Sequence, residues 1–151
     1  MIWQLLYGAI VSLFNFGLHA IFTGLIIVAT GHTVRLTSRM TVFVRMASLM
    51  FVTMVVLMIA HVLEIAVWAT HYAWIGLDVK NATSFEFAFE NYTALGYGDA
   101  TPPEAWRLTG PITALNGLLL IGWSVAVIFE VMRMAEVRFR RLPLERKKAR
   151  R

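Results

Sequence analysis

The sequence contains no cysteine and few charged residues. The 151 residues include no cysteine, which excludes a disulfide-bonded scaffold, a thiol nucleophile and a cysteine-ligated zinc site. Only 15% of the residues are charged, whereas soluble domains carry about 25%, and residues 1–34 contain no Asp, Glu, Lys or Arg. Hydrophobic residues make up 58% of the chain, and its mean hydropathy is +0.66. A soluble chain of this size would bury so much apolar surface only poorly, so the composition indicates a small membrane protein.

Long apolar runs predict three membrane-spanning helices in a single all-α membrane domain, residues 1–151. The first run lacks the basic start of a signal peptide and is too long for its apolar core, so we expect a retained helix. The second run ends in an aromatic stretch that suits the membrane–water interface. The expected segments are an extra N-terminal helix at 7–30, an outer helix at 46–75, a pore helix and loop at 84–99, an inner helix at 102–134 and a basic tail at 135–151.

The few charges are sorted by loop, which predicts the orientation. Arginines lie between the first two spans, and nine of the last nineteen residues are Lys or Arg, whereas residues 78–107 hold an acidic excess. Because basic loops stay in the cytoplasm, we expect the N-terminus outside and the C-terminus inside, in the plasma or inner membrane. The tail either binds anionic lipid headgroups or serves only as a topology signal. No aromatic or folded platform accompanies its charges, so nucleic acid is not an expected partner.

The acidic outer segment contains a short helix followed by a glycine-rich loop. Thr83 and Glu86 have the spacing of a capping box, which predicts a helix start. The following residues are too apolar to lie bare in water, and they lead into Gly96-Tyr97-Gly98. Glycines at alternate positions let the backbone turn successive carbonyls to one side. Non-helical backbone is tolerated at membrane depth only where it is buried in protein or lines a water-filled path, so we expect a re-entrant pore loop.

The loop resembles the signature of potassium channels. That signature usually reads Thr-Thr-Val-Gly-Tyr-Gly-Asp, and this chain has Thr-Ala-Leu-Gly-Tyr-Gly-Asp at 93–99. The resemblance covers residues 46–134 and is greatest to small prokaryotic ion-channel proteins with a Trp-Arg-Leu and a Gly-Trp-Ser after the filter, here at 106–108 and 122–124.

The resemblance implies a passive potassium channel that assembles as a homotetramer around one axis, with no enzymatic activity and no cofactor besides the permeant ion. The implied filter consists of Thr93, Ala94, Leu95, Gly96, Tyr97, Gly98 and Asp99. Potassium would bind the backbone carbonyls of Ala94, Leu95, Gly96 and Tyr97. Glu90 matches a pore-helix carboxyl that pairs with the Asp after the filter in some family members, here Asp99.

Ala94 departs from the family pattern. Family channels place a Thr there, and its hydroxyl completes the innermost ion site. With Ala94 one oxygen per subunit is missing, although the backbone carbonyl remains. We therefore expect weaker discrimination among monovalent cations than in a typical potassium channel.

The inner helix has a start signal at 101–104 and a Gly-Pro step at 110–111, where it either kinks or begins afresh. Gly117 and Gly122 permit either bending or the close approach of a neighbouring helix, and close approach is favoured. Glu130 either rings the inner mouth or pairs with Arg133 or other neighbours at the interface. The helical face expected to line the pore consists of Asn116, Leu120, Ser124 and Val127.

Polar residues inside two spans form a second candidate site. Asn15 and His19 lie on one face of the first span, and His61 and Glu64 lie three residues apart on the second. Asn15 and His61 are at matching depth, so a hydrogen-bonded clamp between the helices is expected, with an external pH sensor as the alternative. Two other classes stay open: a bis-His haem protein using His19 and His61, and a non-conducting scaffold or accessory subunit with a channel-like loop.

Overall fold

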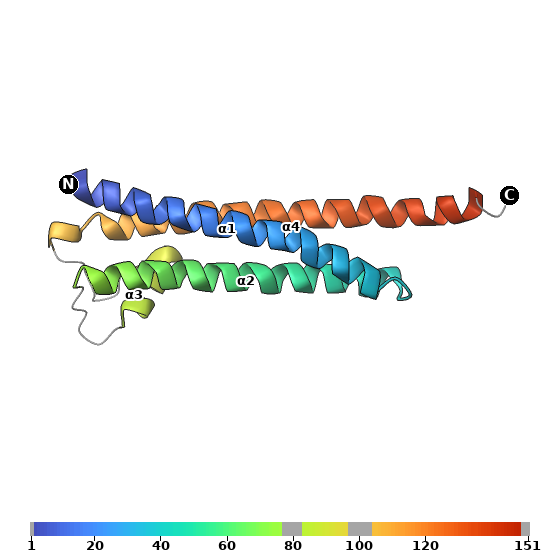
Figure 1. Cartoon of the computed structure of the whole chain (residues 1–151), viewed down its shortest axis with the longest axis horizontal. Coiled ribbons are helices and arrows are strands. Elements are labelled where there is room, and N and C mark those ends of the chain that lie inside the picture. The colour runs from blue at the N-terminus through green and yellow to red at the C-terminus, as the bar shows by residue number, and fades with distance from the viewer. Residues whose placement is uncertain (1, 77–82, 97–103, 149–151) are drawn as a thin grey trace. The chain divides into compact units, whose positions relative to one another are not determined.

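The computed structural model describes residues 2–76, 83–96 and 104–148, with side chains up to Val137. Every regular element in these ranges is helical (Figure 1). The elements are α1 at Ile2–Leu36, α2 at Val42–Trp74, α3 at Ser84–Tyr92, a 3₁₀ turn η1 at Glu104–Trp106 and α4 at Thr109–Lys148. The predicted all-α class is therefore confirmed for the described part of the chain.

Three helical segments among the described residues are long and apolar enough to cross a membrane, as predicted. They are Ile2–Leu36, Val42–Trp74 and Glu104–Val137. Each helix is longer than its apolar run, because backbone hydrogen bonding continues into polar residues once a helix has formed. At the Gly-Pro step the chain begins a helix afresh: η1 ends at Trp106 and α4 starts at Thr109.

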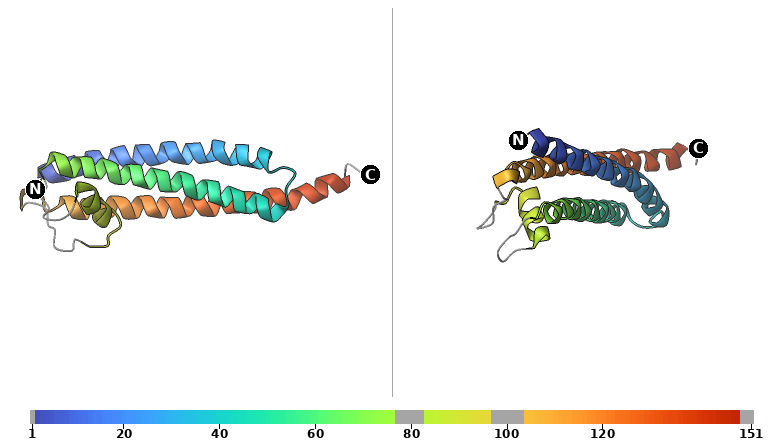
Figure 2. Two further views of the ribbon diagram at one scale, coloured as in Figure 1. Left: turned by 90° about the horizontal axis from the view of Figure 1, so that it is seen from below. Right: turned by 60° about the vertical axis from the view of Figure 1, so that its left-hand side comes forward.

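The chain forms two compact units, each made of segments from α1, α2 and α4. One unit comprises residues 1–21 and 58–123 and includes α3. Figure 2 shows α3 lying beside α2 within it. Its core joins residues of α2, α3 and α4: Ile65, Trp68, Ala69, Tyr72, Phe87, Ala88, Tyr92 and Leu120. The rings of Tyr72 and Phe87 meet edge to face with centroids 4.9 Å apart.

Two glycines in this unit allow close helix contacts. A Cβ atom at Gly117 would overlap the Tyr92 backbone carbonyl, so only glycine lets α4 pass this close to the end of α3. At Gly8, a Cβ would lie 2.8 Å from the Ile112 side chain. The close-approach interpretation is thus confirmed for Gly117, whereas a Cβ at Gly122 would meet open space.

The other unit comprises residues 22–57 and 124–151. Two apolar clusters lie among its described side chains: Ile26, Leu57 and Val131 form one, and Leu49 packs with Ala135 in the other. Threonine hydroxyls along its helices donate to backbone carbonyls of the same helix. The Thr53 hydroxyl, for example, donates to the Leu49 carbonyl at 2.9 Å. A hydroxyl satisfied within its own helix can sit in an apolar layer without a partner from another helix.

Candidate pore loop and the polar cluster behind it

The start of α3 has the predicted capping box. The Glu86 backbone N–H donates to Thr83 Oγ1 at 3.2 Å, and the Thr83 backbone N–H donates to the Glu86 carboxylate at 2.6 Å. This backbone donor holds the pKa of the Glu86 carboxyl below its ordinary value. The nine-residue helix carries aromatic residues on both of its faces. Phe87 and Tyr92 are buried, whereas Phe85 and Phe89 are exposed.

The chain leaves α3 through two left-handed residues. Ala94 has φ of 55° and Gly96 has φ of 114°, while Thr93 keeps a helical conformation. The Ala94 backbone N–H donates to the Asn91 carbonyl at 2.9 Å and the Leu95 N–H to the Glu90 carbonyl at 3.0 Å, which closes the helix end. Left-handed backbone costs a residue with a Cβ about 1–2 kcal/mol, and most for a β-branched one.

Of the predicted filter, Thr93–Gly96 lie in the described part of the chain, and all four are exposed in the single subunit. Tyr97, Gly98 and Asp99 lie outside the described residues. Glu90 is partly buried on α3, but its expected partner Asp99 is among those not described. The Thr93 hydroxyl donates to the Phe89 carbonyl at 2.9 Å.

Behind α3, the Glu64 carboxylate is fully buried and contacts three side chains. Oε1 lies 2.8 Å from His19 Nδ1 of α1, and Oε2 lies 3.0 Å from His61 Nδ1. The Tyr92 hydroxyl of α3 donates to Oε2 at 2.5 Å and also lies 2.9 Å from His61 Nδ1. A single carboxylate therefore joins α1, α2 and α3. A buried carboxylate is tolerated only with such partners.

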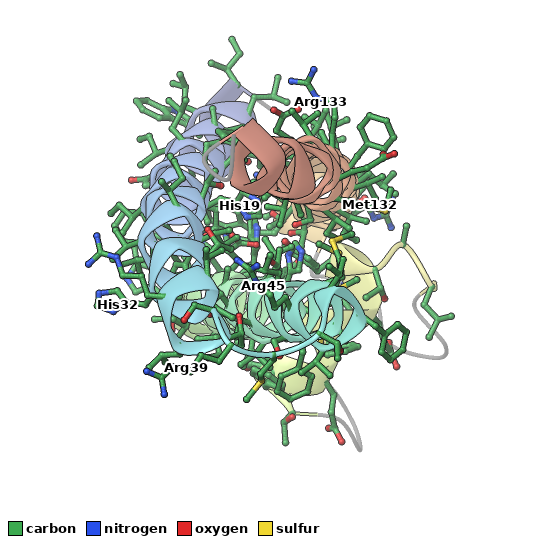
Figure 3. The ribbon with its side chains drawn as sticks, turned by 90° about the vertical axis from the view of Figure 1, so that its right-hand side faces the viewer. His19, His32, Arg39, Arg45, Met132 and Arg133 are labelled. Carbon is green, nitrogen blue, oxygen red and sulfur yellow. The ribbon has the colours of Figure 1, made fainter. Side chains whose placement is uncertain are left out.

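A second polar group centres on Asn116 of α4. Its Oδ1 accepts from Trp68 Nε1 at 2.9 Å and from Asn15 Nδ2 at 3.2 Å, and Asn15 also donates to the Glu64 backbone carbonyl. The structure thus brings Asn15, His19, His61 and Glu64 together, as the spacing suggested. Figure 3 shows His19 on the inner side of α1, whereas His32 points outward.

The predicted pore-lining face requires correction. Asn116 and Leu120 are buried against other helices of their own chain, and Ser124 is 5% exposed. Val127 is partly buried and packs on the cluster of Ile26, Leu57 and Val131. A side chain covered by its own subunit does not line an axis shared by several subunits. The prediction relied on the polar residues of one helix face. Those residues make the polar contact between helices within the chain.

The opposite face of α4 is exposed in the single chain. Its members are Leu115, Leu118, Gly122 and Phe129, spaced along one side of the helix. Near its inner end Glu130 pairs with Arg133, with 2.8 Å between Oε1 and Nη2, so the pairing alternative for Glu130 is the one observed.

The two histidines of the haem alternative both lie beside Glu64. Their ring centroids are 5.5 Å apart, and both Nδ1 atoms contact the Glu64 carboxylate.

Two members of the cluster were missed at the sequence level. Tyr92 lies in the apolar stretch after Glu86, where its hydroxyl gives no local sign of a partner, although a buried tyrosine usually needs one. Trp68 belongs to the aromatic stretch predicted to lie at the membrane interface, yet its ring is fully buried and its Nε1 donates inside the protein. The signal for Tyr92 in the sequence is Glu64 itself, because a carboxylate inside a span needs hydrogen-bond donors from the neighbouring helices.

Comparison with known proteins supports the class indicated by this geometry. Residues 60–134 match the model of the family described as ion channel, whose members have potassium-channel-like pores. The chain therefore carries an ion-channel-family domain, and the match runs from the second half of α2 through α3 and the loop into α4. Searches of curated proteins and of solved structures found no significant match.

Proposed function

We propose that the protein is a cation channel of the potassium-channel type, in which four copies of the 93–99 loop surround one axis. The observation that carries this proposal is the capped, half-buried helix α3, which ends at the left-handed residues Ala94 and Gly96 inside an ion-channel-family domain. Carbonyls of Ala94, Leu95, Gly96 and Tyr97 would replace the hydration shell of K⁺. The absent hydroxyl at Ala94 makes the selectivity for K⁺ over Na⁺ weaker than in family members with Thr.

Assembly as a homotetramer explains apolar surface that one chain leaves bare. Phe85 and Phe89 of α3 are exposed, and so is the Leu115–Phe129 face of α4. In a tetramer the α3 face meets a neighbouring subunit and the α4 face lines the inner pore. The proposed orientation has the N-terminus outside and the basic tail inside, in the plasma or inner membrane, with anionic lipid headgroups at the tail.

The decisive experiment is ion flux through the purified protein in liposomes. Native protein should carry K⁺ down its gradient, and Gly96→Ala should lose most of this flux because a side chain disfavours the φ of 114°. Gly17→Ala is the matched control, since a Cβ there meets nothing within 4 Å, and its flux should equal the native value. A folded, tetrameric protein without flux would instead indicate the non-conducting scaffold or accessory subunit.

A further inference from the structure

The cluster of His19, His61 and Glu64 has a chemistry that ion conduction does not use. Two imidazoles and one carboxylate converge here, and one ligand atom from each lies within 4.8 Å of the other two. His61 and Glu64 are three residues apart on α2, so they project from the same side of the helix, and His19 faces them from α1. Such a donor set on facing helices of a bundle is a common way to build a metal site.

We propose that His19, His61 and Glu64 bind a zinc ion between α1 and α2. Zinc is commonly bound by imidazole nitrogen and carboxylate oxygen, whereas Mg²⁺ and Ca²⁺ prefer ligand sets made of oxygen alone. Tetrahedral zinc with ligands at about 2.1 Å places neighbouring ligand atoms about 3.4 Å apart. The contacts of 2.8 Å and 3.0 Å between Glu64 and the two Nδ1 atoms are near this value, so small side-chain shifts suffice.

Binding exchanges hydrogen bonds for coordination. Each Nδ1 that ligates zinc presents its lone pair, so the imidazole proton resides on Nε2 and the Nδ1 contact to the Glu64 carboxylate is replaced by a bond to the metal. The Tyr92 hydroxyl lies 2.9 Å from His61 Nδ1 and donates to Glu64 Oε2, so it keeps the carboxylate oriented. His61 is the most accessible of the three ligands, with 17% of its side chain exposed, and marks the entry side.

The site sits directly behind the pore loop. Tyr92 touches the Glu64 carboxylate through its hydroxyl and is followed by Thr93, the first residue of the proposed filter. Zinc binding would therefore cross-link α1 and α2 at the point where α3 is anchored. The binding itself does not depend on whether the loop conducts ions.

The test is a zinc and cobalt titration of the full-length protein, purified without a polyhistidine tag. Native protein dialysed against buffered Zn²⁺ should retain one zinc per chain by elemental analysis. His61→Ala should bind at least about tenfold more weakly because it loses a direct ligand. His32→Ala is the matched control: the same substitution at an exposed histidine of α1 should leave zinc binding unchanged.

Cobalt provides a second measurement that does not need the variant to fold. Co²⁺ added to native protein should give the intense visible absorption of a tetrahedral ion, and added Zn²⁺ should abolish it. Native protein that binds neither ion, or a folded His61→Ala that retains native zinc affinity, would overturn the proposal. Neither measurement involves ion flux, so a protein that fails to bind zinc would not contradict the channel proposal. Conversely, a protein without ion flux can still bind zinc.

Discussion

Ala94 differs from the Thr of the potassium-channel signature in two ways that matter for the loop: it has no β-branch and no hydroxyl. Its φ of 55° suits a small residue, and a threonine there would add a β-branch to a left-handed backbone. The replacement of Thr by Ala is therefore consistent with the local backbone as well as with a changed ion site. These two effects can be separated, because serine adds the hydroxyl without the branch.

Ala94→Ser should raise the permeability ratio of K⁺ to Na⁺ severalfold, because each subunit regains one oxygen at the innermost ion site. The measurement is the reversal potential under bi-ionic K⁺ and Na⁺ conditions. Ala94→Val is the control: it adds a branch without an oxygen and should leave the ratio at or below the native value. Strong K⁺ preference in the native protein would show that the missing hydroxyl does not limit selectivity.

Substitution of Glu64 distinguishes a structural clamp between the helices from a sensor of external pH. His19 of α1, His61 of α2 and Tyr92 of α3 are the titratable groups that face it. As a clamp, Glu64→Gln should lower the free energy of unfolding by about 1–3 kcal/mol, because charge-assisted hydrogen bonds are lost in a buried site. Glu130→Gln, which removes an exposed ion pair, should lower the free energy of unfolding less than Glu64→Gln does.

The clamp also predicts that external pH affects the current of Glu64→Gln and of native protein alike. Recording current across a range of external pH in both proteins provides this comparison. A titration present in native protein and absent in Glu64→Gln would favour the sensor.

At the scale of single elements, α4 shows two faces with different tasks. One face is buried against its own chain through Asn116 and Leu120, and the other presents Leu118 and Phe129. Because α3 passes so close to Gly117, the buried face of α4 is held against α3 and is not free to turn toward an axis shared with other chains.

The absence of native cysteine makes this assignment directly testable. Leu118→Cys should react with a small water-soluble thiol reagent and lose current, because the side chain is expected to line the pore. Leu120→Cys is two residues away, fully buried, and should stay unreactive. Reaction at position 120 with protection at 118 would restore the face first expected from the polarity of α4.

The sequence predicts the helices better than it predicts the contacts between them. The α3 start was predictable because a capping box depends on two residues three apart, and the spans were predictable because their apolar runs are long. Which face of α4 is buried was not predictable, because Asn116 suits a wet pore and a buried hydrogen bond equally well. The helix-to-helix role of Tyr92 likewise depends on α2 and α3 packing together, which local spacing does not encode.

At the scale of the whole molecule, charge sorting and the position of the pore loop make one joint prediction about orientation. The segment between α2 and α4 is acidic and should lie outside. The turn between α1 and α2, which contains Arg39 and is flanked by Arg35 and Arg45, should lie inside. A filter loop entering from the outer side, as proposed, requires the same arrangement.

Glu104→Cys in intact cells should therefore react with a membrane-impermeant thiol reagent. Arg39→Cys, in the turn after α1, should react only after the membrane is permeabilised. Both positions are exposed in the subunit, so accessibility across the bilayer alone distinguishes them. The reverse pattern would invert the topology and place the loop on the cytoplasmic side.

Tyr92 is held at both of its ends by different membrane helices. Its hydroxyl donates to Glu64 of α2, and its backbone carbonyl rests against Gly117 of α4. Any tilt of α2 relative to α4 must then pull on Tyr92, the residue that precedes the proposed filter. Bilayer thickness changes helix tilt, so in the proposed channel the acyl length of the lipids would be transmitted to the loop through Tyr92.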